Sequence, residues 1–539
     1  MSETYGGAPS EAYGGALYAR FQRGLALAPE RAAVRGPGWA LTYRELHERS
    51  LTWAGSLLHA IGEADGSGQP RTVGVLAAKG PDAYTGVLAG LCAGLTVVPV
   101  SPDFPAPRVR QMLDAAGVSA VIADGPGAAL LADGTADGTA DGTADGTADG
   151  TADGRPLPVL ATEGGTLRPD PARALTGPRP VRPEDSAYLL FTSGSTGRPK
   201  GVRVTHGGAG HYFQELDARY DFTPEDVFSQ TFDLNFDCAM FDLFCAWGAG
   251  ATLQQIPAAA YRDLPGYVAS AGITVWFSTP SAIALARRTG GLDAGVLPGV
   301  RWSFFAGEAF TDRDAADWHR AAPHTYIENL YGPTELTVTI TGHRWSPEDP
   351  AHWTVNGVVP IGTVHKGHDW LLLGPDGAPV PDEGELIVSG PQMTSGYLDP
   401  RDEEGRFLDH DGRRWYRTGD RVRQVGQGVL AYVDRLDAQV QVQGWRVEPA
   451  EIDERLRSVD GVEDAVTVAV PGPDGQSVLV AFHTGERLSP AALARGLRAQ
   501  LPDRMIPRRF AHLDTFPLNP NRKTDRKALR AAAAELLGG

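Results

Sequence analysis

Cysteine is scarce in this chain, and apolar runs long enough to span a membrane are lacking. The three cysteines among 539 residues, Cys92, Cys238 and Cys245, show neither paired nor metal-binding spacing. This excludes a disulfide framework and fits a reducing compartment. No apolar stretch reaches the ~18 residues that cross a bilayer, and residues 1–16 lack the basic start and apolar run of a signal peptide. The sequence therefore predicts a cytoplasmic protein with no membrane partner.

Positive charge is also in short supply. The chain has 49 Lys and Arg against 66 Asp and Glu, a formal net charge of −17. This argues against a nucleic-acid partner, because such binding relies on Lys and Arg. Part of the negative charge lies in residues 132–154, where Ala-Asp-Gly-Thr repeats. That segment has no apolar bulk, so we predict a low-complexity surface insertion, with calcium binding as the open alternative.

The length and the apolar pattern indicate an α/β protein with more than one domain. At 539 residues the chain exceeds what a single core supports. Strand-like runs at 72–76, 96–100 and 119–122 alternate with helical patterns at 83–93 and 107–116. Such alternation favours largely parallel sheets, in which ligands bind beyond the carboxyl ends of the strands.

The pattern changes after about residue 361. Short strands and turns at 370–373, 384–389 and 430–433 indicate a β-rich subdomain. Beyond residue 437 we predict a compact α+β tail. Its predicted helices cover 452–459 and 490–501, the second capped by Ser489, and its predicted strands cover 462–470 and 477–483.

A buried strand at 187–190 ends in a loop of hydroxyls and glycines, residues 191–201 (FTSGSTGRPKG). Glycines let the backbone come close to an anion, and N–H groups and hydroxyls can donate to phosphate oxygens. The spacing is not that of a P-loop. On composition alone, an ordinary turn and a phosphate-binding loop remain equally good interpretations.

Residues 192–201 resemble the phosphate loop of the adenylate-forming enzymes, which include nonribosomal peptide synthetase adenylation domains, acyl-CoA synthetases and luciferases. Other signatures of that superfamily follow in its order. They are similar to 329–335 (NLYGPTE), 416–420 (YRTGD), 434–440 (DRLDAQV) with 444–448 (GWRVE), and 519–526 (NPNRKTDR). The resemblance extends over nearly the whole chain. Because the sequence ends at Gly539, we expect a stand-alone adenylation enzyme of the nonribosomal peptide synthetase type.

The resemblance implies a domain plan. Residues 1–436 would form a large N-terminal domain of parallel-type sheets with helices and a β-rich subdomain, containing the insertion at 132–154. Residues 437–539 would form a small, mobile α+β domain. Asp437 would be the hinge between them, absorbing a backbone rotation between two half-reactions.

The resemblance also implies ATP and Mg²⁺ as cofactors and assigns the catalytic residues. Lys523 would bridge the substrate carboxylate and the phosphate, although Arg522 stands where the family commonly has glycine. Thr334 would donate to the α-phosphate. Glu335 would bind Mg²⁺, an ion typically held by one or two carboxylates together with phosphates.

The nucleotide would be bound by residues of several motifs. Tyr331 would offer a flat face to adenine, Asn329 a hydrogen-bonding pair to its edge, and Asp420, supported by Arg435, acceptors for the ribose hydroxyls. Lys200 would track the β- and γ-phosphates. The other members of this group are Thr192, Ser193, Gly194, Ser195, Thr196, Gly197 and Gly332.

Residues 231–243 align with the superfamily's substrate segment and place Asp237 where a substrate ammonium would bind. An aspartate in an apolar pocket is costly unless it is paired; Asp233 and Asp242 are the rival candidates. The predicted side-chain pocket consists of Cys238, Phe241, Ser278, Phe304, Ala306, Leu330, Val338 and Thr339. Because this set carries no charge, we expect an apolar or weakly polar substrate, in a pocket of limited depth.

The predicted function is ATP-dependent activation of such an amino acid, α or β, to an aminoacyl-AMP. The aminoacyl group would then pass to the phosphopantetheine thiol of a separate carrier protein. Two alternatives stay open. One is an acyl- or aryl-CoA ligase, which would not need an amino group on its substrate. The other is a non-catalytic nucleotide-binding module.

Overall fold

The structure is a computed structural model that describes residues 17–62, 71–133, 157–194, 198–437, 439–472, 476–517 and 524–538. Most of the predicted insertion at 132–154 lies outside the described residues. So do four residues of the predicted site, Ser195, Thr196, Gly197 and Lys523.

The predicted strand–helix alternation forms a six-stranded sheet in the order β6-β5-β3-β4-β7-β8, parallel except for the last pair. The central strands are apolar on both faces, as parallel strands covered by helices must be. The strands are β3 (Thr72–Leu76), β4 (Thr96–Val100), β5 (Val118–Ala123), β6 (Val159–Leu160), β7 (Ser186–Thr192) and β8 (Lys200–Thr205), and the helices that follow β3, β4 and β5 are α3 (Pro81–Cys92), α4 (Ala106–Ala115) and α5 (Gly125–Asp133).

A second sheet of nine strands, in the order β15-β14-β13-β12-β11-β9-β10-β1-β2, lies beside the first; its inner strands are parallel. The strands are β1 (Ala32–Gly36), β2 (Trp39–Thr42), β9 (Val227–Gln230), β10 (Thr252–Gln255), β11 (Val275–Ser278), β12 (Trp302–Phe305), β13 (Tyr326–Tyr331), β14 (Thr341–Trp345) and β15 (Thr363–Val364).

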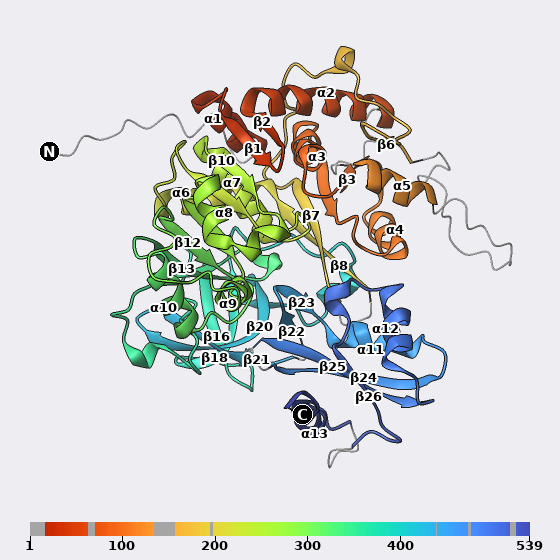
Figure 1. Ribbon diagram of the computed structural model, residues 1–539, viewed down its shortest axis with the longest axis vertical. Coiled ribbons are helices and arrows are strands. Elements are labelled where there is room, and N and C mark those ends of the chain that lie inside the picture. The colour runs from red at the N-terminus through yellow and green to blue at the C-terminus, as the bar shows by residue number, and fades with distance from the viewer. Residues whose placement is uncertain are drawn as a thin grey trace.

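Helices fill the space between these sheets and cover their outer faces (Figure 1). The main core between them receives α1 (Leu17–Leu27), α2 (Tyr43–Ile61), α3, α6 (His206–Arg219) and α7 (Asp237–Ala249). A separate core joins the nine-stranded sheet to α8 (Leu264–Ala271), α9 (Ser281–Arg288) and α10 (Asp312–Ala321). Helix α2 begins at a capping box, in which Thr42 and Glu45 satisfy each other's backbone N–H groups.

The predicted β-rich region is an antiparallel sheet ordered β17-β16-β18-β20-β19, with β21 paired to β20. Its strands are β16 (Asp369–Leu373), β17 (Pro379–Val380), β18 (Glu383–Ser389), β19 (Phe407–His410), β20 (Arg413–Gly426) and β21 (Val429–Arg435). The α/β class and the β-rich region are therefore confirmed.

The α+β tail begins with a hairpin, β22 (Val440–Val442) and β23 (Trp445–Val447), that lies between the large sheets and the rest of the tail (Figure 1). The remaining elements are β24 (Val462–Pro471), β25 (Ser477–Gly485), β26 (Arg509–His512), α11 (Pro449–Arg457), α12 (Pro490–Arg498) and α13 (Arg526–Gly538).

Ser489 caps α12 as predicted, accepting a hydrogen bond from the Ala492 N–H at 3.3 Å. The prediction that this helix reaches Leu501 is wrong, because the helix ends at Arg498. Pro502 disfavours a helical backbone at the residue before it, which explains why the helix stops short of Leu501.

Candidate active site

A cavity of about 880 Å³ lies where the carboxyl ends of β7 and β13 meet the start of α7 and the β22–β23 hairpin. Its size is within the range of small-molecule sites. This is the position at which open α/β sheets bind ligands. The motifs at 192–201, 329–335, 416–420, 434–440 and 444–448 all contribute residues to its wall, whereas the described residues of 519–526 do not.

Asp237 is the first residue of α7, and its carboxylate faces the cavity. The Thr334 hydroxyl donates to Asp237 Oδ2 at 2.7 Å. Burial raises the pKa of Asp237 to about 6, and this effect outweighs the hydrogen bond from Thr334. The carboxylate therefore gains from a cation in the cavity, such as a substrate ammonium.

The two rival aspartates lie elsewhere. Asp233 is exposed and is 3.4 Å from Lys79 Nζ. Asp242 is buried on α7, away from the cavity wall, and burial raises its pKa well above the ordinary range. Of the three, only Asp237 is placed to meet a ligand in this cavity.

The predicted side-chain pocket divides into two layers. Cys238, Ala306, Leu330 and Val338 line the cavity. The other four predicted residues, Phe241, Ser278, Phe304 and Thr339, are buried and do not line it.

Packing explains the position of the second layer. Phe241 and Phe304 have ring centroids 5.0 Å apart, and Phe241 also packs on Phe277 at 4.8 Å. The Ser278 hydroxyl accepts from Trp276 Nε1 at 3.0 Å and donates to the Thr279 carbonyl at 3.1 Å. These side chains form a floor behind the cavity wall and do not line the cavity itself.

The predicted nucleotide residues form a connected group at the end of β13. The Tyr331 hydroxyl donates to Asp420 Oδ2 at 2.6 Å, and Arg435 Nη1 donates to Asp420 Oδ1 at 2.8 Å. Asn329 differs from expectation, because its amide nitrogen donates to the carbonyls of Val359 and Pro360 at 3.1 and 2.9 Å. The amide nitrogen of Asn329 is thus engaged within the protein, which leaves the side-chain carbonyl oxygen for the predicted contact with the adenine edge.

The described part of the phosphate loop approaches the hairpin of the tail. Thr192 and Ser193 line the cavity. The Ser193 hydroxyl donates to the Arg446 carbonyl at 2.6 Å and accepts from the Glu448 N–H at 3.1 Å. Lys200 is buried at the start of β8 and does not line the cavity; burial and the neighbouring Arg406 lower its pKa.

Two glycines of the site occupy crowded backbone positions. A Cβ on Gly332 would lie 2.6 Å from Thr339 Cα, and a Cβ on Gly194 would lie 2.1 Å from the Arg198 carbonyl oxygen. Both distances are too short for any side chain. Steric fit alone therefore accounts for glycine at both motif positions.

Glu335 is buried in a short helix, Thr334–Leu336, and both of its oxygens have partners. The Tyr397 hydroxyl donates to Oε1 at 2.6 Å and Arg446 Nη1 donates to Oε2 at 2.8 Å. Burial alone would raise the pKa of Glu335, but the Arg446 guanidinium and the Tyr397 hydroxyl lower it to about 2. The carboxylate is therefore ionised.

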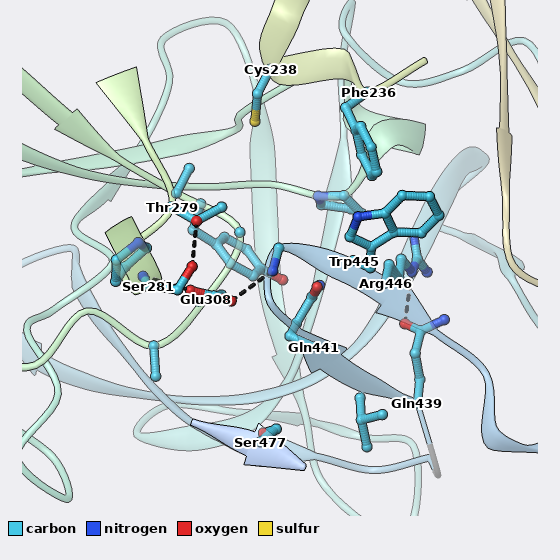
Figure 2. A pocket seen from close by; sticks show the side chains of 18 of the residues that line it. Phe236, Cys238, Thr279, Ser281, Glu308, Gln439, Gln441, Trp445, Arg446 and Ser477 are labelled. Atoms are coloured by element: carbon cyan, nitrogen blue, oxygen red, sulfur yellow. Dashed lines mark hydrogen bonds between the residues drawn. The ribbon is translucent and has the colours of Figure 1, made fainter. Parts of the chain in front are cut away.

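The hairpin of the tail adds contacts that sequence reasoning missed. The Gly444 N–H donates to Glu308 Oε1 at 2.6 Å. The Trp445 ring packs on the Phe236 ring, with ring centroids 4.9 Å apart (Figure 2). Arg446 Nε donates to Gln439 Oε1 at 2.7 Å. Gly444, Trp445 and Arg446 lie in the matched motif at 444–448, so the motif was an available signal.

The hinge candidate Asp437 lies on the cavity wall beside Arg435, whose Nε donates to Asp437 Oδ1 at 2.8 Å. Lys523 lies outside the described residues. Three residues further on, Arg526 begins α13 and pairs with Asp453 at 3.2 Å, which ties the start of this helix to α11.

Comparison with known proteins agrees with this geometry. Residues 21–398 match the AMP-binding enzyme family, and the chain belongs to that family. Over 521 residues the chain is 32% identical to the L-proline–[L-prolyl-carrier protein] ligase of Pseudomonas fluorescens, covering 95% of this chain and 98% of that protein. A peptide synthetase relative, 34% identical, is longer, and the chain spans 44% of its length.

Solved structures confirm the fold. IdnL7, known from a crystal structure, shares 52% sequence identity with this chain. The match covers 97% of this chain and 99% of IdnL7, with a TM-score of 0.72. The Vibrio cholerae adenylation domain AlmE, solved with glycyl-adenosine-5'-phosphate, is 26% identical, covers 98% and 100%, and has a TM-score of 0.83. The resemblance to adenylation enzymes read from the motifs is thereby confirmed.

Two further observations concern partners of the chain. Within the described ranges, no helix combines the length and apolarity needed to cross a membrane. For Mg²⁺, the described residues offer no cluster of three or more ligating side chains. Glu335 still fits the ion, because one ionised carboxylate together with phosphates is a usual Mg²⁺ donor set.

Proposed function

We propose that this protein activates an amino acid with ATP to form an aminoacyl-AMP and transfers the aminoacyl group to the phosphopantetheine thiol of a separate carrier protein. The observation that carries the proposal is Asp237, whose carboxylate faces the same cavity as Tyr331 and Asp420. The proposed ammonium-binding group and the proposed nucleotide-binding groups thus line one cavity. The ligase relative that joins L-proline to a carrier protein supports the same reaction class.

The chemistry requires cations and donors around the reacting groups. A carboxylate and a triphosphate repel each other, and the negative charge at the α-phosphorus must be stabilised in the transition state. Thr334, on the cavity wall, would donate to the α-phosphate, and Lys523 would neutralise the carboxylate and phosphate. Mg²⁺ held by Glu335 would supply positive charge to the phosphates when it is bound.

The second half-reaction would use a different placement of the tail. IdnL7 shares 52% identity but superposes less well, at a TM-score of 0.72, than AlmE at 26% identity and 0.83. A different placement of the tail would account for the lower score. The boundary at residues 436–437 and the hinge role of Asp437 stay predictions.

We further propose that the substrate has a compact apolar or weakly polar side chain, on an α- or a β-amino acid. Cys238, Ala306, Leu330 and Val338 bound the end of the cavity beside Asp237, and the Phe241–Phe304 pair closes it behind them. Packed cores resist expansion, so a long or aromatic side chain would have to displace this floor.

Amino-acid-dependent exchange of pyrophosphate into ATP tests the proposal. Small amino acids should support exchange, whereas large, acidic and basic ones should not. Exchange driven equally well by fatty or aryl acids would favour the acyl- or aryl-CoA ligase instead. Nucleotide binding without exchange for any acid would favour the non-catalytic module.

A further inference from the structure

The backbone just after the motif at 329–335 is strained. Thr337 and Val338 have φ angles of 57° and 66°, and they are the two β-branched residues among the non-glycine residues with positive φ in the described ranges. A β-branched residue in this region is a genuine outlier. The Thr339 N–H donates to the Thr337 carbonyl at 2.9 Å, which closes a γ-turn centred on Val338. A γ-turn with positive φ at its centre is rare and strained, and such strain persists only where the surroundings impose it.

The buried side chain of Gln392, in the segment after β18, supplies this constraint. It has no exposed surface. Its Nε2 donates to the carbonyls of Leu336 and Thr339 at 3.0 and 2.9 Å, one on each side of the strained pair. The Thr337 hydroxyl donates to the Gln392 carbonyl at 2.6 Å. Relaxation of the turn would move these groups apart and leave a buried amide without partners, which is costly.

His365, the residue after β15, fixes the orientation of Gln392. Because the amide nitrogen of Gln392 faces carbonyls, its Oε1 is the atom that lies 3.2 Å from His365 Nδ1, and that nitrogen donates. Burial and the neighbouring Arg219 lower the pKa of His365 to about 3, so the ring stays neutral. The ring stacks on Tyr212, with centroids 6.1 Å apart, and the Tyr212 hydroxyl lies 3.1 Å from Thr339 Oγ1. The far side of the turn is thus held as well.

The nucleotide end of the same segment has supports of its own. The Glu335 carbonyl accepts from the Thr394 N–H at 2.7 Å, and Glu335 Oε1 accepts from the Tyr397 hydroxyl at 2.6 Å. Neither bond involves the side chain of Gln392. Loss of the Gln392 bonds should therefore disturb Val338 and leave Glu335 in place.

We propose that Gln392, oriented by His365, is a positioning residue that holds Val338 on the cavity wall and so limits the size of the amino-acid side chain that is accepted. Val338 lines the cavity, whereas Gln392 and His365 do not. Without the Gln392 bonds the turn relaxes to negative φ, the Val338 side chain leaves the wall, and a larger side chain fits. The proposal rests on the proposed function in taking this end of the cavity as the amino-acid site.

Pyrophosphate exchange with an accepted amino acid and with its homologue one methylene longer tests the proposal. One methylene in an apolar pocket changes kcat/KM roughly 10–200-fold. Gln392→Leu replaces the amide by an apolar side chain of similar size, and it should reduce this discrimination about tenfold and raise the KM for the accepted amino acid. The KM for ATP should change less than about threefold, because the nucleotide end is held separately.

The matched control is Gln254→Leu. Gln254 is also buried, and its Nε2 donates to the Gln255 carbonyl and the Tyr267 hydroxyl, both at 3.0 Å, but it does not line the cavity or contact the turn. This variant should keep the discrimination of the parent. Unchanged discrimination in Gln392→Leu, or an equal fall in both variants, would overturn the proposal.

A second variant and a structure make the test independent of folding and of turnover. His365→Phe keeps a ring to stack on Tyr212 but removes the donor to Gln392, so discrimination should fall in the same direction even if Gln392→Leu does not fold. A crystal structure of either variant should show Val338 with negative φ, and a retained positive φ contradicts the proposal. Because φ needs no turnover, a parent that exchanges with no amino acid would reject the proposed function and not the role of Gln392 at the turn.

Discussion

Replacement of Asp237 by asparagine removes the charge that we assign to the substrate ammonium while keeping the shape of the side chain. Asp237 faces the cavity, and burial raises its pKa to about 6, so its charge is poorly solvated before substrate binds. Loss of one member of a buried charge pair costs about 2–5 kcal/mol. The kcat/KM for the amino acid should therefore fall between roughly 30-fold and several thousand-fold.

Pyrophosphate exchange with the amino acid and ATP titrated separately measures this effect. The KM for ATP should change less than about threefold, because Asp237 would contact only the amino acid. Asp233→Asn is the matched control, since Asp233 lies in the same segment but is exposed. A loss below about tenfold in the amino-acid kcat/KM, or an equal loss for ATP, would refute the assignment of Asp237.

Four further outcomes are expected. Lys523→Ala should lower adenylate formation by more than about tenfold with little effect on ATP binding, and a smaller loss rejects its role. Asp420→Asn should raise the KM for ATP roughly tenfold, because Tyr331 and Arg435 hold that carboxylate in place; an unchanged KM contradicts its placement at the ribose. Because the pKa of Asp237 is raised to about 6, its carboxylate is lost as the pH falls through that value. The amino-acid kcat/KM of the parent should fall there, and Asp237→Asn should lack this step. A short Gly/Ser linker in place of residues 132–154 should change the free energy of unfolding by less than ~0.5 kcal/mol, as measured by denaturant titration; a larger loss means that the segment packs or binds.

Local sequence patterns predicted helices and strands well where the spacing of apolar residues matches the side of the element that is buried. The runs at 72–76 and 96–100 are strands β3 and β4 with those bounds. A short apolar run followed by a helical pattern is typical of a buried strand in an α/β fold. Ser489 caps α12 because capping depends on neighbouring residues alone. The same helix ends at Arg498 and not at Leu501, because Pro502 disfavours a helical backbone at the residue before it.

The site was only partly predictable, because its decisive contacts join distant segments. Glu335 and Arg446 are 111 residues apart in the chain, and no local pattern states that they pair. Motif matching gave the positions of Phe241 and Phe304 but not their depth, which is set by packing against Phe277. The use of the Asn329 amide by the Val359 and Pro360 carbonyls likewise depends on the folded backbone.

The measurement that tests the central claim most directly is pyrophosphate exchange with an accepted amino acid and with its des-amino acid. The two acids differ only in the ammonium that Asp237 is proposed to bind. The account predicts rapid exchange with the amino acid and very little with the des-amino acid at equal concentration. Equal exchange with both acids would contradict amino-acid activation and leave the acyl-CoA ligase alternative in its place.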